Sequence, residues 1–224
     1  MIEKAMMFAT LAHTGQTRKG SDLPYIIHPM EVAVIVASIL GELGRHDEDI
    51  VCAAILHDTC EDAKVRQETL QALFNPRVAD LVAAQSEDKT VKDWKTRKQH
   101  TIDFLREEKD LDVKIIALAD KLANIRAIRR DQSILGDRLW ESFHEKRKSE
   151  HHWYYASLAD CLKELSGLEA YAEYCRLVKE VFGKVSEATS EPTSEPTSEA
   201  TSGATFEATS EVTSESPSVR GSCS

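Results

Sequence analysis

The sequence predicts an all-α fold, and two observations carry that prediction. Apolar residues recur at helical spacing in most segments of the first 183 residues, beginning with Ile2–Ala12. No segment shows the sustained alternation, rich in β-branched side chains, that is typical of strands. At 224 residues the chain is long enough for one domain with a sizeable core.

Individual helices are bounded by capping and helix-breaking residues. Pro29 suits the first position of a second helix. Asp47 or Asp49 lies near the start of a third, whose apolar run leads into His57. Asn75 is an expected N-cap that precedes Pro76 in the first turn of another helix. Apart from the third, the expected helices are at residues 2–12, 30–43, 66–74, 77–86, 93–106 and 113–130, with two or three more in 136–183.

Composition changes sharply near residue 186. From residue 187 the sequence runs through eight tetrads of Ser, Thr, Glu and small residues, such as EATS and EPTS. Such a segment cannot bury enough apolar surface to offset its conformational entropy. We therefore expect a helical domain over residues 1–185 and a disordered, low-complexity tail over residues 186–224.

Charge, cysteine content and hydropathy argue against a nucleic-acid-binding, a disulfide-rich or a membrane-spanning protein. The tail holds seven Glu and one Arg, so the domain carries about −4 of the net charge of −10. A mildly acidic domain is a poor ligand for nucleic-acid polymers, whereas a small nucleotide needs only a metal and a few local cations. Five scattered cysteines suggest free thiols in a reducing compartment. The longest apolar run is too short to span a bilayer, so we expect a cytoplasmic protein with no membrane partner.

The most informative stretch is residues 55–62, ILHDTCED. An apolar run leads directly into His57, Asp58, Glu61 and Asp62, and desolvating such groups unpaired costs about 1–3 kcal/mol each. On a continuous helix, residues four apart share a face, so these four side chains would lie together. The adjacent His-Asp pair could hold a divalent cation. The alternative is a solvated helix end with a hydrogen-bonded core histidine.

Two other stretches favour the metal. His28 precedes the proline of PYIIHP, and Asp120 lies in the middle of the apolar segment ALADKLAN. Together His28, His57, Asp58 and Asp120 would supply two nitrogen and two oxygen ligands. Such a mixed ligand set is more typical of a site for Mn²⁺ or a similar ion than of a closed zinc site made of thiolates. The alternative is that each is a buried polar residue with an ordinary hydrogen-bond partner.

Five motifs in a fixed order carry a family resemblance. They are AHTGQTRKG from residue 12, PYIIHP from 24, HDTCED from 57, EDKT from 87 and ADKLANIR from 119. On these motifs the chain resembles the HD-domain metal-dependent phosphohydrolases, and within them the (p)ppGpp hydrolase domains of RelA/SpoT proteins and the stand-alone small alarmone hydrolases, including the metazoan SpoT homologue. The resemblance covers about residues 1 to 130 and implies an HD-domain helical bundle, Mn²⁺ and a role in the stringent response.

The resemblance also implies roles for individual residues. Glu61 and Asp62 would be the catalytic acids, because a carboxylate near a metal can orient a water molecule or take its proton. The other implied contacts hold the guanosine nucleotide: Arg18, Lys19, Lys121 and Asn124. An arginine can fork onto phosphate or stack on a purine, and the alternative is a set of solvated surface groups.

Several positions depart from the family pattern or stay open. Cys60, Ala63 and Ala123 replace residues common in relatives, and the last puts base specificity in question. His13 fits the pattern, and a structural role is favoured for it. Arg97 and Lys98 form a basic patch that either is solvated or faces phosphate.

The resemblance implies a hydrolase that removes the 3′-pyrophosphate of (p)ppGpp to give GDP or GTP. We expect it to be a stand-alone hydrolase, because too few residues follow Asp120 for a synthetase domain. The alternatives are an HD phosphohydrolase acting on another nucleotide, such as the 2′-phosphate of NADPH, and a non-catalytic nucleotide-binding module. The oligomeric state is left open.

Overall fold

The computed structural model describes residues 1–18 and 22–183, and in these ranges the predicted all-α fold is confirmed. No strand occurs there, and the β-type pairing is an isolated bridge between Thr17 and Pro24. Two predictions lie outside the described residues, namely the nucleotide contact of Lys19 and the tail at residues 186–224. The domain boundary at residue 185 stays a prediction.

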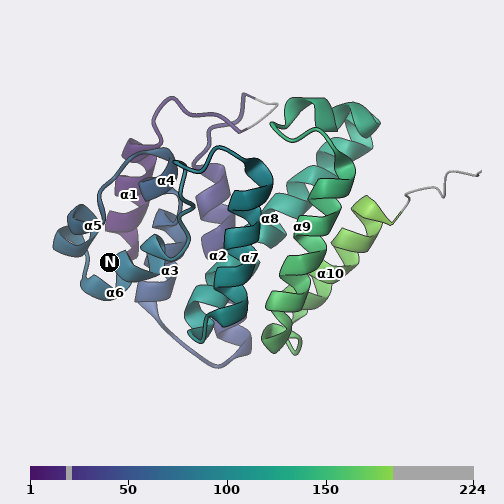
Figure 1. Cartoon of the computed structure of the whole chain (residues 1–224). Helices are drawn as coiled ribbons and strands as arrows, with labels where there is room; N and C mark the ends of the chain where they lie inside the picture. Colours follow the sequence, from purple (N-terminus) through teal and green to yellow (C-terminus); the bar gives the residue numbers. More distant parts are fainter. Residues whose placement is uncertain (19–21, 184–224) are drawn as a thin grey trace, which may run out of the picture. The chain divides into compact units, whose positions relative to one another are not determined.

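Helices follow one another along the described part of the chain and are joined by loops (Figure 1). In chain order they are α1 (Ile2–Ala12), α2 (Ile27–Glu42), α3 (Glu48–Leu56), α4 (Thr59–Asp62), α5 (Gln67–Leu73), α6 (Pro76–Ala83), α7 (Trp94–Glu107), α8 (Leu111–Leu135), the 3₁₀ helix η1 (Gly136–Ser142), α9 (Lys148–Cys161), η2 (Lys163–Leu165) and α10 (Glu169–Phe182).

The capping predictions are largely confirmed. Asn75 accepts a hydrogen bond from the backbone N–H of Val78 at 2.8 Å, directly before Pro76. Asp47, rather than Asp49, is the N-cap of α3. One start differs: α2 begins at Ile27, so its proline lies in the third helical position instead of the first. The ring is tolerated there because the first-turn N–H groups of a helix have no partner inside that helix.

The chain does not continue as one helix through the HDTCED motif. α3 ends at Leu56, and Glu61 and Asp62 belong to the separate turn α4. Side chains take the carbonyls that would continue the helix: His57 Nδ1 bonds to the oxygen of Ala54 at 2.8 Å. Thr59 Oγ1 bonds to that of Leu56 at 2.7 Å. Such local side-chain bonds compete with helical ones.

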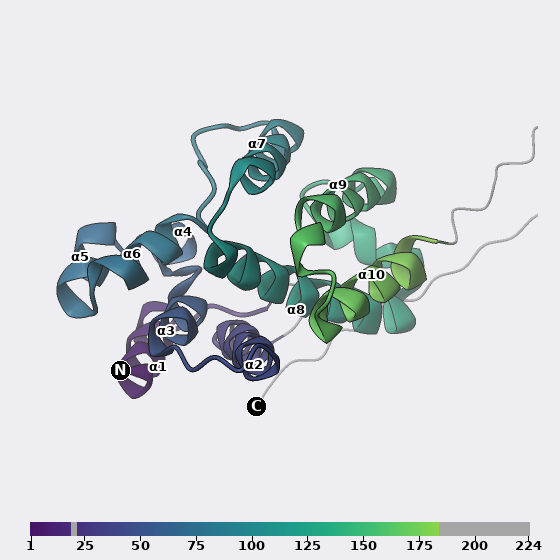
Figure 2. The same cartoon turned by 90° about the horizontal axis from the view of Figure 1, so that it is seen from below.

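Helix α8 is the central element of residues 1–183. In Figure 2 it runs between the group α1–α6 and the pair α9 and α10. It contacts α2 and α3 on one side and α10 on the other. Every side chain from Asp112 to Asp120 is buried, as expected of a helix covered all round.

This packing decides which side chains meet. His28 lies on α2 and His57 directly after α3, while Asp120 lies on α8. Because α2 packs against both α3 and α8, the three are brought to one place. Among the described residues, no helix is both long and apolar enough to cross a membrane.

Candidate metal centre and adjoining cavities

Two histidines and two aspartates meet where α2, α3 and α8 pack. His28 Nε2 is 3.0 Å from Asp120 Oδ1, and His57 Nε2 is 2.9 Å from Asp58 Oδ2. The crossed pairs are longer, at 3.7 Å and 3.8 Å. One ligand atom each from His28, His57 and Asp120 lies within 4.8 Å of the others. These three residues are a potential site for a divalent metal ion. Asp58 lies next to that site, because its Oδ2 faces the Nε2 atoms of both histidines.

The hydrogen bonding of His57 fits a metal ligand. Its Nδ1 faces the carbonyl oxygen of Ala54, which can only accept, so Nδ1 carries the proton. In the neutral ring Nε2 then presents a lone pair to the cluster, where Asp58 Oδ2 lies 2.9 Å away. A ligand histidine oriented by an Nδ1–H to carbonyl bond is the usual arrangement at metal sites.

The carboxylates strongly affect the charge of His57. Burial opposes protonation of the ring, but Asp58 and Asp120 outweigh it and raise the pKa of His57 to about 9. Burial also disfavours charge on Asp58, yet His57 holds the pKa of that carboxyl well below its usual value. A proton and a metal ion would therefore compete for Nε2, as is general for histidine ligands.

Asp120 is held from three sides. Its Oδ1 accepts from Asn124 Nδ2 at 2.6 Å as well as facing His28, and its Oδ2 lies 2.6 Å from Lys121 Nζ. Burial raises the pKa of Asp120, but Lys121 and the histidines outweigh it and hold the value well below the ordinary one. Asn124 lies one helical turn after Asp120, so the two side chains point the same way.

The two acids of α4 lie beside this cluster. Glu61 and Asp62 line a cavity of about 180 Å³ together with His28, Asp58 and Asp120. Burial raises the pKa of Glu61. Three of the four side chains expected to lie together, Asp58, Glu61 and Asp62, thus share this cavity although the helix is broken, and His57 contacts it through Asp58.

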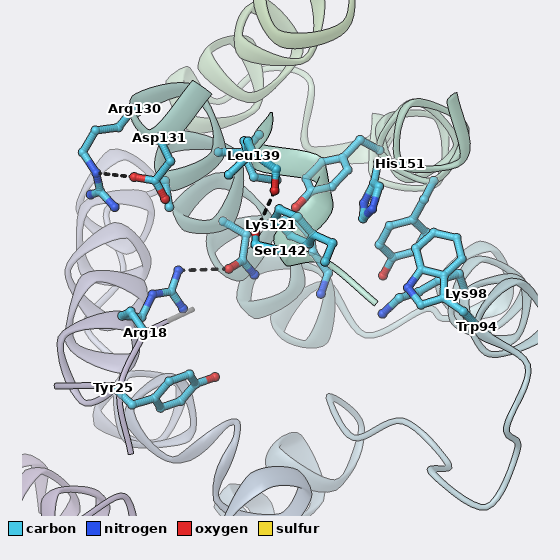
Figure 3. A pocket seen from close by; sticks show the side chains of 16 residues that line it. Arg18, Tyr25, Trp94, Lys98, Lys121, Arg130, Asp131, Leu139, Ser142 and His151 are labelled. Carbon is cyan, nitrogen blue, oxygen red and sulfur yellow. Dashed lines mark hydrogen bonds and ion pairs between the residues drawn. The ribbon is translucent and has the colours of Figure 1, made fainter. Parts of the chain in front are cut away.

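A second, larger cavity adjoins the first. It has a volume of about 310 Å³, and Tyr25, Lys98, Lys121 and Asn124 line both. Figure 3 shows Arg18 and Tyr25 on one side of it, facing Trp94, Lys98 and His151 on the other. Its walls therefore combine cationic groups with aromatic rings.

The residues predicted to contact a nucleotide line this larger cavity where they can be located. Arg18 lies 3.4 Å from Asn124 and stacks over Tyr25 at 5.8 Å from the ring centroid. His13 is buried and bonds to Gln16 through Nδ1 at 2.8 Å, which agrees with a structural role.

The two residues of the basic patch, Arg97 and Lys98, have different surroundings. Lys98 lies at both cavities, 4.9 Å from the ring centroid of Tyr154. Arg97 instead donates to the backbone oxygens of Val91 and Lys92, at 3.0 Å each, and braces the loop before α7.

Sequence reasoning assigned no role to three residues that the fold brings to the site. Tyr25 donates from its hydroxyl to Asp58 Oδ2 at 2.6 Å and reaches Asp62 at 3.3 Å. Lys89 contacts both acids of α4. The hydroxyl of Tyr154 is buried at the larger cavity, with no hydrogen-bond partner among the described residues. Tyr25 and Lys89 stand inside quoted motifs, which was an available signal, whereas nothing local marks Tyr154.

Comparison with known proteins agrees with this geometry. The model of the HD domain family matches residues 5–143, more than half of the chain. The guanosine-3′,5′-bis(diphosphate) 3′-pyrophosphohydrolase of Vibrio cholerae is 38% identical over 132 residues, which is 57% of this chain and 18% of that protein. A GTP pyrophosphokinase of Myxococcus xanthus is 32% identical over 141 residues, covering 57% and 17%. The chain thus spans less than a fifth of the curated relatives.

Two solved structures match over most of their length. One is described as a metazoan orthologue of SpoT that hydrolyses ppGpp and plays a role in starvation responses. It has a TM-score of 0.63 at 25% identity, covering 81% of this chain and 93% of that one. The other, a protein of Listeria monocytogenes, has a TM-score of 0.61 at 34% identity, covering 70% and 99%.

Proposed function

The chain belongs to the HD-domain family, and from that premise we propose that it is a metal-dependent hydrolase of (p)ppGpp. The reaction removes the 3′-pyrophosphate and leaves GDP or GTP. The observation that carries this proposal is that His28 and Asp120, which form a potential metal site with His57, line the same cavity as Glu61 and Asp62. The names of the Vibrio and metazoan relatives support the choice of nucleotide.

His28, His57 and Asp120, with Asp58 beside them, would hold the metal ion. Imidazole and carboxylate ligands suit Mn²⁺, the ion we propose. A divalent ion supplies Lewis-acid stabilisation of phosphoryl oxygens and makes water more acidic. The Nδ1 bond of His57 and the contacts of Asp120 fix the orientation of both side chains, and the ion would replace the proton on His57 Nε2.

Glu61 and Asp62 would handle the attacking water. Among the described residues their ion pairs are with Lys89 rather than with the imidazoles, and both line the cavity in which the substrate would lie. Burial raises the pKa of Glu61, which improves a carboxylate as a proton acceptor near neutral pH. The attacking water would lose a proton to this pair and form a bond to the phosphorus nearest the ribose. The bond from that phosphorus to the 3′ oxygen would break, and the 3′ oxygen would take up a proton and leave as the hydroxyl.

The larger cavity would hold the nucleoside end. A volume of about 310 Å³ is at the small end of the usual range for ligand pockets. Arg18 can stack on a base or fork onto phosphate, and Lys98 and Lys121 add positive charge next to the reacting group. Asn124 and Arg18 already contact each other across this cavity, so one base or ribose would meet both.

The test is a substrate panel with the purified chain and Mn²⁺. We expect release of pyrophosphate from ppGpp and pppGpp, loss of turnover in EDTA, and its return on adding Mn²⁺. NADPH, GTP and a phosphomonoester are the competing substrates. Asp58→Ala, which removes a carboxylate from the histidines, is the inactive control.

Each result of the panel has a definite meaning. Faster release of phosphate from NADPH than of pyrophosphate from ppGpp would replace the proposed substrate while keeping the hydrolase. Binding of nucleotide without turnover of any compound, in protein shown to carry metal, would indicate a non-catalytic binding module.

A further inference from the structure

The two acids of the site lie on an element that cannot hold them by itself. α4 is a single turn of four residues, Thr59–Asp62. One isolated turn is unstable, because helix nucleation is unfavourable without neighbouring turns. Lys64, two residues later, has a backbone φ of +57°, so the chain turns away at once. The orientation of Glu61 and Asp62 must therefore come from other parts of the fold.

The loop between α6 and α7 supplies most of those contacts. Lys89 Nζ is 2.6 Å from Asp62 Oδ1 and 3.3 Å from both Oε1 and the backbone oxygen of Glu61. The backbone N–H of Glu87 donates to the other carboxylate oxygen of Glu61 at 3.1 Å. A single lysine thus joins both acids, and the same loop holds Glu61 by both of its oxygens.

This loop is itself braced. Asp88 accepts from the N–H and the hydroxyl of Thr90 at 2.9 Å and 2.6 Å. Arg97 of α7 donates to two carbonyls of the loop, and Lys98 lies 2.5 Å from the carboxylate of Glu87. Lys89 is therefore presented by an ordered backbone that is fixed to α7.

Stability does not explain this arrangement. The Lys89 side chain is 53% exposed, and ion pairs in such positions contribute about 0–1 kcal/mol. Lys89 lies between two partly buried acids. Its contacts therefore affect the orientation of these acids more than they affect the free energy of unfolding.

We propose that Lys89 is a positioning residue that holds both carboxylates of the acid pair at the metal cavity in their working orientation. The inference rests on the proposed function. Lys89 contacts both acids, and among the described residues it forms no hydrogen bond or ion pair with the histidines or Asp120.

The charge of Lys89 also acts on Glu61. Burial and the carboxylates of Glu87 and Asp58 raise the pKa of Glu61, while the Glu87 N–H and Lys89 lower it. Without the lysine the pKa of Glu61 rises further, so a base that must be ionised becomes active only at higher pH. Asp62 keeps a contact with the hydroxyl of Tyr25 and is affected less.

Three variants test the proposal in the full chain. Lys89→Met removes the ammonium, Lys89→Arg keeps a charge of similar reach, and Lys92→Met removes a charge from the same exposed loop away from the acids. The rate constant kcat and the ratio kcat/KM are measured from pH 5 to 9, with metal content and Tm on the same samples.

In Lys89→Met we expect kcat at pH 7 to fall at least about tenfold and the acid limb of the profile to move up by at least about half a pH unit. Metal content and Tm should stay at wild-type values. Lys89→Arg should recover most of the rate, and Lys92→Met should match the wild type. A Lys89→Met profile that overlays the wild type, or a Lys89→Arg variant as slow as Lys89→Met, overturns the proposal.

A second measurement needs no substrate. The pKa of Glu61 is followed by carboxyl ¹³C NMR in the Mg²⁺-loaded wild type and Lys89→Met, with Glu61→Gln used to assign the signal. We expect the pKa to rise in Lys89→Met, and an unchanged value overturns the role of the lysine. If the wild type turned over no nucleotide, the proposed function would fail, but this titration would still decide the inference.

Discussion

Helix α8 carries two buried aspartates with opposite surroundings. Asp112 and Asp120 are 8% and 9% exposed and lie eight residues apart on the same helix. Asp112 meets two guanidinium groups: Arg45 lies 2.7 Å from its Oδ1, and Arg77 lies 2.5 Å from its Oδ2. Asp120 instead meets His28, Asn124 and Lys121.

The difference shows that burial of an acid does not by itself mark a functional site. Two permanently charged arginines neutralise Asp112 and leave nothing for a ligand to complete. Around Asp120 the imidazoles can present lone pairs, which need a proton or a metal ion. Asp112 therefore has a structural role: its ion pairs with Arg45 and Arg77 connect α8 to the α2–α3 loop and to α6. Asp120 instead belongs to the candidate metal centre.

The largest effect should come from Asp120→Asn. The change keeps the shape of the side chain but removes a charged oxygen ligand, so we expect less than about a tenth of the wild-type metal content. Turnover should fall by at least about 10³-fold, since both metal and its chemistry are lost. Elemental analysis and pyrophosphate release measure the two. A variant that keeps one metal ion per chain would remove Asp120 from the centre.

Glu61 extends the comparison to an acid whose ion pair is with Lys89 rather than with arginine or histidine, and Glu61→Gln tests it. We expect wild-type metal content and Tm but a loss of about 10²–10⁴ in turnover, because a proton acceptor is gone. Asp62→Asn should also be impaired. Metal-loaded variants within about threefold of the wild type would mean that the acid pair does not activate the water.

Asp112→Asn should show the reverse pattern to Asp120→Asn. Metal content and turnover should stay within about twofold, whereas the free energy of unfolding should fall by about 1–3 kcal/mol as the charged hydrogen bonds weaken. The lower part of that range is expected, because the side chains of Arg45 and Arg77 are 37% and 46% exposed. Urea unfolding measures the loss, and reduced metal content would contradict the comparison.

The smallest expected effect is a pH dependence of the stability that Asp112→Asn removes. Burial raises the pKa of Asp112, but the guanidiniums outweigh it and hold the folded-state value below the ordinary one. The stabilisation is therefore complete above the unfolded pKa of about 3.9 and is lost as the pH falls through the folded value. The difference between wild type and Asp112→Asn should be constant from about pH 7 to 5 and shrink below about 4. A difference that grows on acidification would reverse the sign of the shift.

Much of this protein was determined locally, by the sequence itself. Helical spacing and caps such as Asn75 place most helices, because a helix satisfies its backbone within a single segment. The motifs around His28, His57 and Asp120 identified the residues that meet at the candidate centre, since a polar residue inside an apolar helix needs a compensating partner.

Tertiary structure decided which partner each of these groups finds. Spacing treats Asp112 and Asp120 alike, and only the packing of α2, α3 and α6 against α8 brings arginines to one and histidines to the other. The same holds for Lys89, whose contacts with α4 span nearly thirty positions of sequence. Local patterns describe what a segment offers, but electrostatic and hydrogen-bond partners depend on distances across the fold, which no single segment contains.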